Sequence, residues 1–93
     1  MPHRVLEDLL DDVPEPRLEK VRSGLDRLTP RELEVLKRAI SGETAGDSAG
    51  GLGISVRTVE LHRQQVLAKL DVKNLTQAVR MIALAQRSQQ QHS

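Results

Sequence analysis

The sequence predicts an all-α fold organised around one long helix. Residues 56–70 contain no Gly or Pro, and Ser55 stands where it can cap the first amide groups of that run. Before and after this run, apolar residues recur at spacings of three and four, which is the period of a helix with one buried face. We therefore expect a helix of about four turns over residues 56–70, packed among other helices.

The composition limits both the core and the chemistry. The 93 residues suffice for one domain, and because they include no aromatic residue and no cysteine, the core must consist of Leu, Val, Ile, Ala and Met. A disulfide and a thiol nucleophile are both excluded, which fits a reducing compartment. No apolar run approaches the roughly eighteen residues of a membrane helix, and the acidic start is unlike a secretory signal. We expect a cytoplasmic protein without membrane contact.

Charge is unevenly distributed along the chain. The formal net charge is +1, but residues 1–28 hold five Lys or Arg against seven Asp or Glu, whereas residues 29–93 hold nine against six. This small asymmetry fits an anion-binding domain preceded by an acidic segment, and it serves only as support for other observations.

Two apolar stripes precede residue 29. The first ends at Pro14 and Pro16, because proline lacks an amide donor and disfavours helix in the residue before it. The second extends over about one and a half heptads and predicts a helix that covers the domain's own core or that forms a dimer or partner contact. The first stripe consists of Val5, Leu6, Leu9 and Leu10, and the second of Leu18, Val21, Leu25 and Leu28.

Residues 29–42 predict the next helix. Thr29 can cap it, Pro30 occupies the first helical position, where a missing amide costs nothing, and Glu32 can return a bond to the cap. Ser41-Gly42 supplies the stop. The expected apolar face consists of Leu33, Leu36 and Ile40, with Val35 and Ala39 beside it.

Residues 44–51 predict a short, weak helix ahead of the long one. Thr44 and Asp47, three residues apart, suggest its start. Three glycines oppose it, because each glycine in a helix interior costs about 1 kcal/mol relative to alanine. They are Gly46, Gly50 and Gly51.

The helix at 56–70 has two different faces. At about 100° per residue, Val59, Val66 and Leu70 share one side with Arg63 and can be buried. The opposite side carries short and amide-bearing side chains, which suit a DNA groove lined with base edges and flanked by phosphates. That side consists of Arg57, Leu61, Gln64 and Ala68, flanked by Glu60 and Gln65.

A last helix is expected after Asn74, which can cap it, with Gln77 at the third position. Its apolar residues lie on more than one side, which predicts contact with its own core and with a second subunit. The glutamine-rich end from Gln86 to Ser93 is expected to fray or be disordered. The core face carries Leu75, Ala78, Val79 and Ile82, and the predicted dimer interface carries Met81, Leu84 and Ala85.

Several motifs follow one another between Leu28 and Ala85. They are Leu28-Thr29-Pro30-Arg31-Glu32-Leu33-Glu34-Val35-Leu36, Leu52-Gly53-Ile54-Ser55, Arg57-Thr58-Val59-Glu60, His62-Arg63, Ala68-Lys69-Leu70 and Ala78-Val79-Arg80. Together they resemble the LuxR/FixJ-type DNA-binding domain of bacterial regulators. The resemblance implies a four-helix helix-turn-helix domain, here with an additional N-terminal helical segment, a recognition helix in the major groove and frequent dimerisation through the last helix.

The resemblance also implies roles for individual residues. Arg63 lies toward the apolar side, so either its stem follows the core while its head reaches the DNA backbone, or it makes no phosphate contact. Glu60 repels phosphate and is expected to accept a hydrogen bond from cytosine. The implied base-contacting residues are Glu60, Leu61 and Gln64, and the implied backbone-contacting residues are Thr58, His62, Arg63 and Lys69. We expect Arg57 to contact the backbone as well, because of its charge and its place at the start of the outward face.

The chain departs from the family pattern at two places. Where the family has an isoleucine, the short helix has Ser48, so its packing on the recognition helix is expected to be weaker. The residues before position 29 are too few for a receiver or ligand-binding domain, so control is expected from abundance, dimerisation or another protein, unless the chain is part of a longer one.

We divide the chain into an N-terminal helical extension at 1–28, a helix-turn-helix domain at 29–86 and a disordered polar tail at 87–93. The expected function is sequence-specific binding of double-stranded DNA by a bacterial transcriptional regulator, as a homodimer, with RNA polymerase or a regulatory protein as a possible partner of residues 1–28. Two alternatives are a promoter-binding module like sigma region 4 and a protein-interaction adaptor with weakened DNA binding. The three histidines are too dispersed for a metal site, no serine has an activating His and Asp, and we expect neither a cofactor nor an enzyme.

Overall fold

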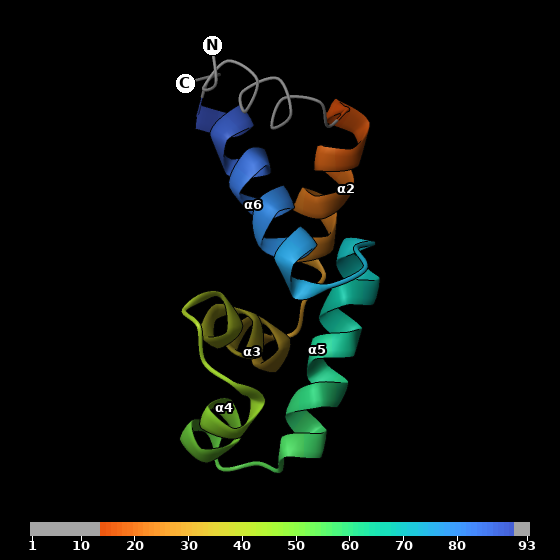
Figure 1. The fold of residues 1–93 in the computed structure, drawn as a ribbon. Helices are drawn as coiled ribbons and strands as arrows, with labels where there is room; N and C mark the ends of the chain where they lie inside the picture. The colour runs from red at the N-terminus through yellow and green to blue at the C-terminus, as the bar shows by residue number, and fades with distance from the viewer. Residues whose placement is uncertain (1–13, 91–93) are drawn as a thin grey trace.

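The computed structural model describes residues 14–90, and all regular structure within them is helical. The predicted all-α fold is confirmed, whereas the apolar stripe at residues 5–10 lies outside the described residues. The helices, labelled in Figure 1, are α2 (Glu15–Asp26), α3 (Pro30–Ile40), α4 (Ala45–Leu52), α5 (Val56–Leu70) and α6 (Leu75–Gln90).

The helices bury two apolar cores, and α5 contributes to both. At one end of the molecule α2 and α6 lie side by side, and toward the other end α3 packs beside the middle of α5 and α4 beside its start (Figure 1). The larger core joins α2, α6, the second half of α5 and Leu36 of α3, and the smaller core joins α3, α4 and Val59. The position of α5 is therefore fixed along its whole length.

The apolar face of α2 covers the domain's own core. Leu18 and Val21 are buried, and Leu25 and Leu28 pack partly buried against the same core. This contact confirms the first of the two interpretations of the second stripe. The helix approaches α5 closely at Gly24, where a Cβ atom would collide with the backbone oxygen of Lys69. A residue without a side chain is required at this crossing.

The buried side of α3 differs from the predicted one. The capping box at Thr29 is confirmed: its hydroxyl accepts from the Glu32 amide at 3.1 Å, and the Glu32 carboxylate accepts from the Thr29 amide at 2.9 Å. Leu33 and Ile40 are 36% and 45% exposed, so their assignment to the buried face was wrong. The helix instead turns Glu32, Val35 and Leu36 inward, because Glu32 meets a cation of α5 there.

The glycine-rich segment forms a complete helix, α4. Thr44 and Asp47 make a capping box, each side chain accepting from the other residue's amide at 3.1 Å. After the last turn, Gly53 adopts the left-handed conformation (φ 68°) and donates its amide to the Ala49 carbonyl. Both ends of α4 thus satisfy backbone groups that would otherwise be unpaired, which offsets part of the cost of its glycines.

The ends of the two longest helices follow the predicted caps only in part. Ser55 caps α5 by accepting from the Thr58 amide at 3.1 Å, as expected. Asn74 accepts from the Gln77 amide at 2.8 Å, but the Gln77 side chain accepts from Lys73 instead of returning a bond to Asn74. The helix α6 continues to Gln90, into the segment for which the sequence predicted fraying or disorder.

Among residues 14–90, no helix is both long enough and apolar enough to cross a lipid bilayer.

Candidate nucleic-acid interface

The outward face of α5 carries the three predicted base-contacting side chains together. Glu60, Leu61 and Gln64 are all exposed, and Leu61 is 50% exposed although it is a large apolar residue. On the opposite side, Val59 and Val66 are fully buried. The helical projection of the sequence is therefore confirmed in its orientation, and the helix presents a mixed apolar and amide surface to solvent.

The first turn of α5 places further polar groups beside this face. Arg57 is exposed, whereas Thr58 and His62 are half-buried. The Thr58 hydroxyl lies 2.8 Å from the Ser55 hydroxyl, so the two side chains form a polar pair at the helix start. A helix N-terminus with its capping hydroxyls favours negative charge, as on a phosphate.

Arg63 points toward the chain itself. Its Nη2 donates to the backbone carbonyl of Glu43 at 3.1 Å, and its Nε is buried without a hydrogen-bond partner among the described residues. Of the two alternatives left by the sequence, this geometry favours the one in which Arg63 makes no phosphate contact, because one end of its guanidinium group is held by the loop before α4.

Lys69 is also held within the chain. Its Nζ donates to Glu32 Oε1 at 2.6 Å and to the Arg27 carbonyl at 3.3 Å, while Arg27 donates to the Lys69 carbonyl at 3.2 Å. The hydrogen bond from Lys69, followed by that from the Thr29 amide, holds the pKa of the Glu32 carboxyl below its ordinary value. From the sequence we expected Lys69 to contact the DNA backbone and Glu32 only to cap its own helix. Local sequence patterns do not show that these two residues meet.

The residues predicted to form the dimer interface lie in the larger core instead. Met81, Leu84 and Ala85 are 3%, 8% and 2% exposed, because α2 covers this side of α6. In this conformation they are not accessible to a second subunit. The exposed apolar residue of α6 is Val79, at 39%, and Ala83 lies exposed one turn further on.

A polar cluster that the sequence did not reveal connects α3, α4 and α5. Arg38 pairs with Glu43 at 3.2 Å, and Glu43 accepts from the buried Ser48 hydroxyl at 3.3 Å. The sequence signal was Ser48 itself, a serine where the family resemblance implied an isoleucine. Its partners could not be inferred, since they depend on how α3 and α4 cross.

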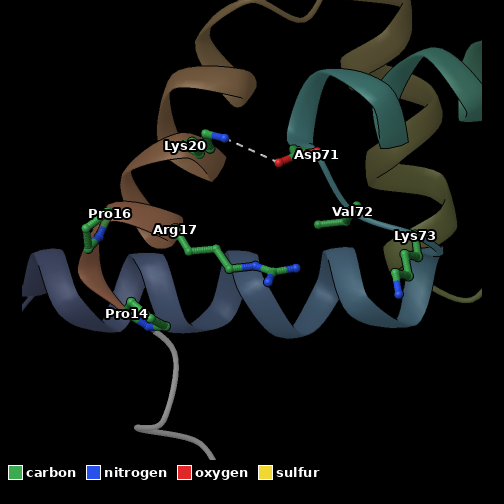
Figure 2. A pocket seen from close by; sticks show the side chains of 7 residues that line it. All are labelled: Pro14, Pro16, Arg17, Lys20, Asp71, Val72 and Lys73. Atoms are coloured by element: carbon green, nitrogen blue, oxygen red, sulfur yellow. Dashed lines mark ion pairs between the residues drawn. The ribbon is translucent and has the colours of Figure 1, made fainter.

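A shallow groove lies where the start of α2 faces the turn between α5 and α6 (Figure 2). Lys20 pairs with Asp71 across it at 3.6 Å, and both side chains are more than 70% exposed. An ion pair this exposed contributes little to stability. Its lining residues are Pro14, Pro16, Arg17, Lys20, Asp71, Val72 and Lys73. The groove is on the side of α2, and none of the predicted base-contacting residues lines it.

No group of three or more His, Cys, Asp or Glu residues that could hold a metal ion occurs within residues 14–90.

Two consecutive helices joined by a left-handed glycine, the second of them with an exposed polar face, define a helix-turn-helix domain of the kind that binds DNA. Residues 26–82 match the model of the luxR family of bacterial regulatory proteins. The chain belongs to this family. The membership confirms the predicted resemblance and the prediction of a regulatory protein rather than an enzyme.

Curated relatives agree with this assignment. The chain is 43% identical over 61 residues to the transcriptional regulatory protein FixJ of Rhizobium meliloti, which is 66% of this chain and 30% of FixJ. It is 46% identical over 54 residues to the quorum sensing-dependent transcriptional regulator RpaR of Rhodopseudomonas palustris, which is 58% of this chain and 22% of RpaR. With the response regulator protein VraR of Staphylococcus aureus the identity is 35% over 63 residues, 68% of this chain and 30% of VraR. The chain therefore spans under a third of the length of these relatives.

Proposed function

We propose that this domain binds double-stranded DNA sequence-specifically, with α5 in the major groove, and thereby regulates transcription in the bacterial cytoplasm. The observation that carries the proposal is the exposed face of α5, where Glu60, Leu61 and Gln64 lie on a helix anchored in two cores. A rigid helix whose outward side chains include an amide, a carboxylate and an apolar group can read adenine, cytosine and the thymine methyl group. The relatives named above are transcriptional and response regulators, which supports this function.

The phosphate contacts come from the residues at the ends of that face. Arg57, Thr58 and His62 flank the start of α5, and exposed Lys73 and Thr76 lie near the start of α6. Arg63 and Lys69 act through the fold, because their cationic groups are already bonded to the chain. Because phosphate contacts release bound counterions, the logarithm of the affinity should fall linearly with the logarithm of the salt concentration.

The domain acts as a homodimer that pairs two copies of α6. The interface uses the exposed stripe of this helix, which is centred on Val79 and Ala83, since the other side of α6 is covered by α2. A two-fold axis along this stripe would place two α5 helices on half-sites about one helical turn apart.

The adaptor alternative loses its main support. It required α4 to hold α5 poorly, whereas α4 is capped at both ends and contributes Ala49 to the smaller core. The family match favours a luxR-type regulator over a module like sigma region 4.

A gel-shift titration of the chain against genomic fragments, at about 50 and 200 mM salt, tests the proposal. We expect retention that weakens steeply between the two salt concentrations and that persists for a subset of fragments at the higher one. Absence of retention at the lower concentration contradicts DNA binding and favours the adaptor.

A further inference from the structure

The loop between α3 and α4 contains one residue, Glu43, whose contacts reach all three helices of the smaller core. Its side chain is 30% exposed, so most of the carboxylate is shielded from water. Both of its oxygens accept from Nη1 of Arg38, at 3.2 and 3.4 Å. The ion pair joins residues five positions apart and ties the end of α3 to the residue directly before the α4 cap.

The same carboxylate satisfies a buried hydroxyl of α4. Ser48 is fully buried, and its Oγ donates to Glu43 Oε1 at 3.3 Å. A buried hydroxyl without a partner destabilises the fold by about 1–3 kcal/mol, so this bond is necessary for a serine at that position.

The Arg38 guanidinium in turn lies close against a glycine of α4. A Cβ atom at Gly51 would collide with Nη1 of Arg38 and lie 2.9 Å from its Cζ. Gly51 therefore allows the charged group to lie against the backbone of α4. Ser48 and Gly51, which weakened the sequence-based prediction of this helix, are two parts of one polar contact between α3 and α4.

The backbone of Glu43 extends the contact to α5. Its carbonyl accepts from Nη2 of Arg63 at 3.1 Å, while the Nε of Arg63 is buried without another partner. Arg63 immediately precedes Gln64, which lies on the outward face of α5. A shift of the Glu43 carbonyl would release the Arg63 side chain and so remove one of the polar contacts that hold the middle of α5.

We propose that Glu43 is a positioning residue for the base-reading face of α5. Its carboxylate, held by Arg38 and Ser48, fixes the path of the loop, and the loop carbonyl holds Arg63, which adds to the two cores in positioning the part of α5 that carries Leu61 and Gln64. The inference rests on the proposed function, because it assigns a role in DNA recognition. Glu43 lies in the loop before α4 and acts through Arg63 rather than by touching a base.

The test compares Glu43→Ala with Glu34→Ala. Glu34 is an exposed residue of α3 whose nearest cation, Arg31, is 3.9 Å away, so both variants lose one negative charge but only one disrupts the cluster. The probes are the duplex that the wild-type chain recovers from a random DNA pool and a scrambled duplex of the same length. Each affinity is calculated from the concentration of folded protein, which circular dichroism measures.

We expect Glu43→Ala to lower the ratio of specific to non-specific affinity about tenfold, which is the effect of a single mismatched base pair. Glu34→Ala keeps the wild-type ratio. Glu43→Gln retains an oxygen that can accept from Ser48 and Arg38, so its loss should be smaller. A merely structural role would lower the folded fraction and leave the ratio unchanged. An unchanged ratio in folded Glu43→Ala overturns the proposal.

Amide hydrogen exchange without DNA provides the second measurement. In Glu43→Ala, or in Glu43→Gln if the alanine variant does not fold, we expect faster exchange at the amides of 59–66 and unchanged exchange in α2 and α6. Equal acceleration throughout the chain contradicts a positioning role. If the wild-type chain recovers no duplex, the proposed function fails, whereas this experiment still decides whether Glu43 holds α5.

Discussion

The ammonium group of Lys69 lies 2.6 Å from Oε1 of Glu32 and joins the end of α5 to the start of α3. The same carboxylate caps α3 by accepting from the Thr29 amide, and the same ammonium donates to the Arg27 carbonyl. The Glu32 side chain is only 7% exposed, so water screens this pair less than a surface pair. One contact thus closes the junction of α2, α3 and α5.

The first prediction concerns the acid stability of the domain. The pKa of Glu32 is lowered in the folded state below its ordinary value of 4.5, so the folded state binds fewer protons at this site than the unfolded state. This contribution to stability is complete above the unfolded pKa and is lost as pH falls through the folded pKa. Urea titrations should show that Glu32→Gln has a smaller loss of unfolding free energy below about pH 4.5 than the wild-type chain. Identical pH profiles for the two proteins would contradict the ion pair.

The second prediction separates two lysines that sequence alone cannot distinguish. Lys69→Gln leaves the buried Glu32 carboxylate without its cation, so the unfolding free energy should fall by about 2 kcal/mol. Lys73→Gln removes the same charge from an exposed side chain and should change stability by under about 0.5 kcal/mol. Chemical denaturation measures both. If both substitutions change the unfolding free energy by the same small amount, Lys69 does not stabilise the fold and is free to contact a DNA phosphate.

The third prediction uses two glycines. Gly24→Ala adds a methyl group against the backbone of Lys69 and 3.0 Å from Cδ2 of Leu70, so it should lower stability by about 1–3 kcal/mol. Gly50→Ala is the matched control, because nothing lies within 4 Å of its Cβ position. There the better helix propensity of alanine should raise stability by up to about 1 kcal/mol. We expect the melting temperature to fall in Gly24→Ala and to rise in Gly50→Ala, relative to the wild-type chain. A stabilised Gly24→Ala variant would show that α2 does not cross α5 this closely.

The fourth prediction concerns the two sides of α6. Leu84→Glu buries a charge in the larger core and should unfold most of the protein, since buried unpaired charges cost several kcal/mol. Val79→Glu alters an exposed residue and should keep the helical signal while it lowers the dimer population. Sedimentation velocity and circular dichroism of both variants measure these effects. A folded, monomeric Leu84→Glu protein would instead place the dimer interface on the side that α2 covers.

Local chemistry made the helix starts predictable. Thr29, Thr44 and Ser55 each accept from the amide three residues ahead, and this pattern needs no knowledge of the rest of the chain. The inward and outward faces of α5 were predictable for the same reason, because a helix of four turns has a regular projection.

Long-range contacts were not predictable from the same patterns. The sequence gives no sign that Glu32 meets Lys69, since the partners are 37 residues apart and the pairing depends on how α3 and α5 cross. Leu33 and Ile40 follow helical spacing as well as Val35 does, but packing on α4 and α5 selects Val35. In the candidate site, too, local features were predictable and long-range contacts were not. The exposure of Gln64 was predicted, whereas the partners of Arg63 and Lys69 within the chain were not.

We propose that the exposed face of α5 reads DNA sequence while α6 pairs two copies of the domain. Selection of duplexes by the purified chain from a random DNA pool tests both parts at once. We expect recovery of a palindrome whose half-sites are about one helical turn apart, with a changed sequence preference for Gln64→Ala. Recovery of no common sequence, or of the same sequence by the Gln64→Ala variant, would contradict it.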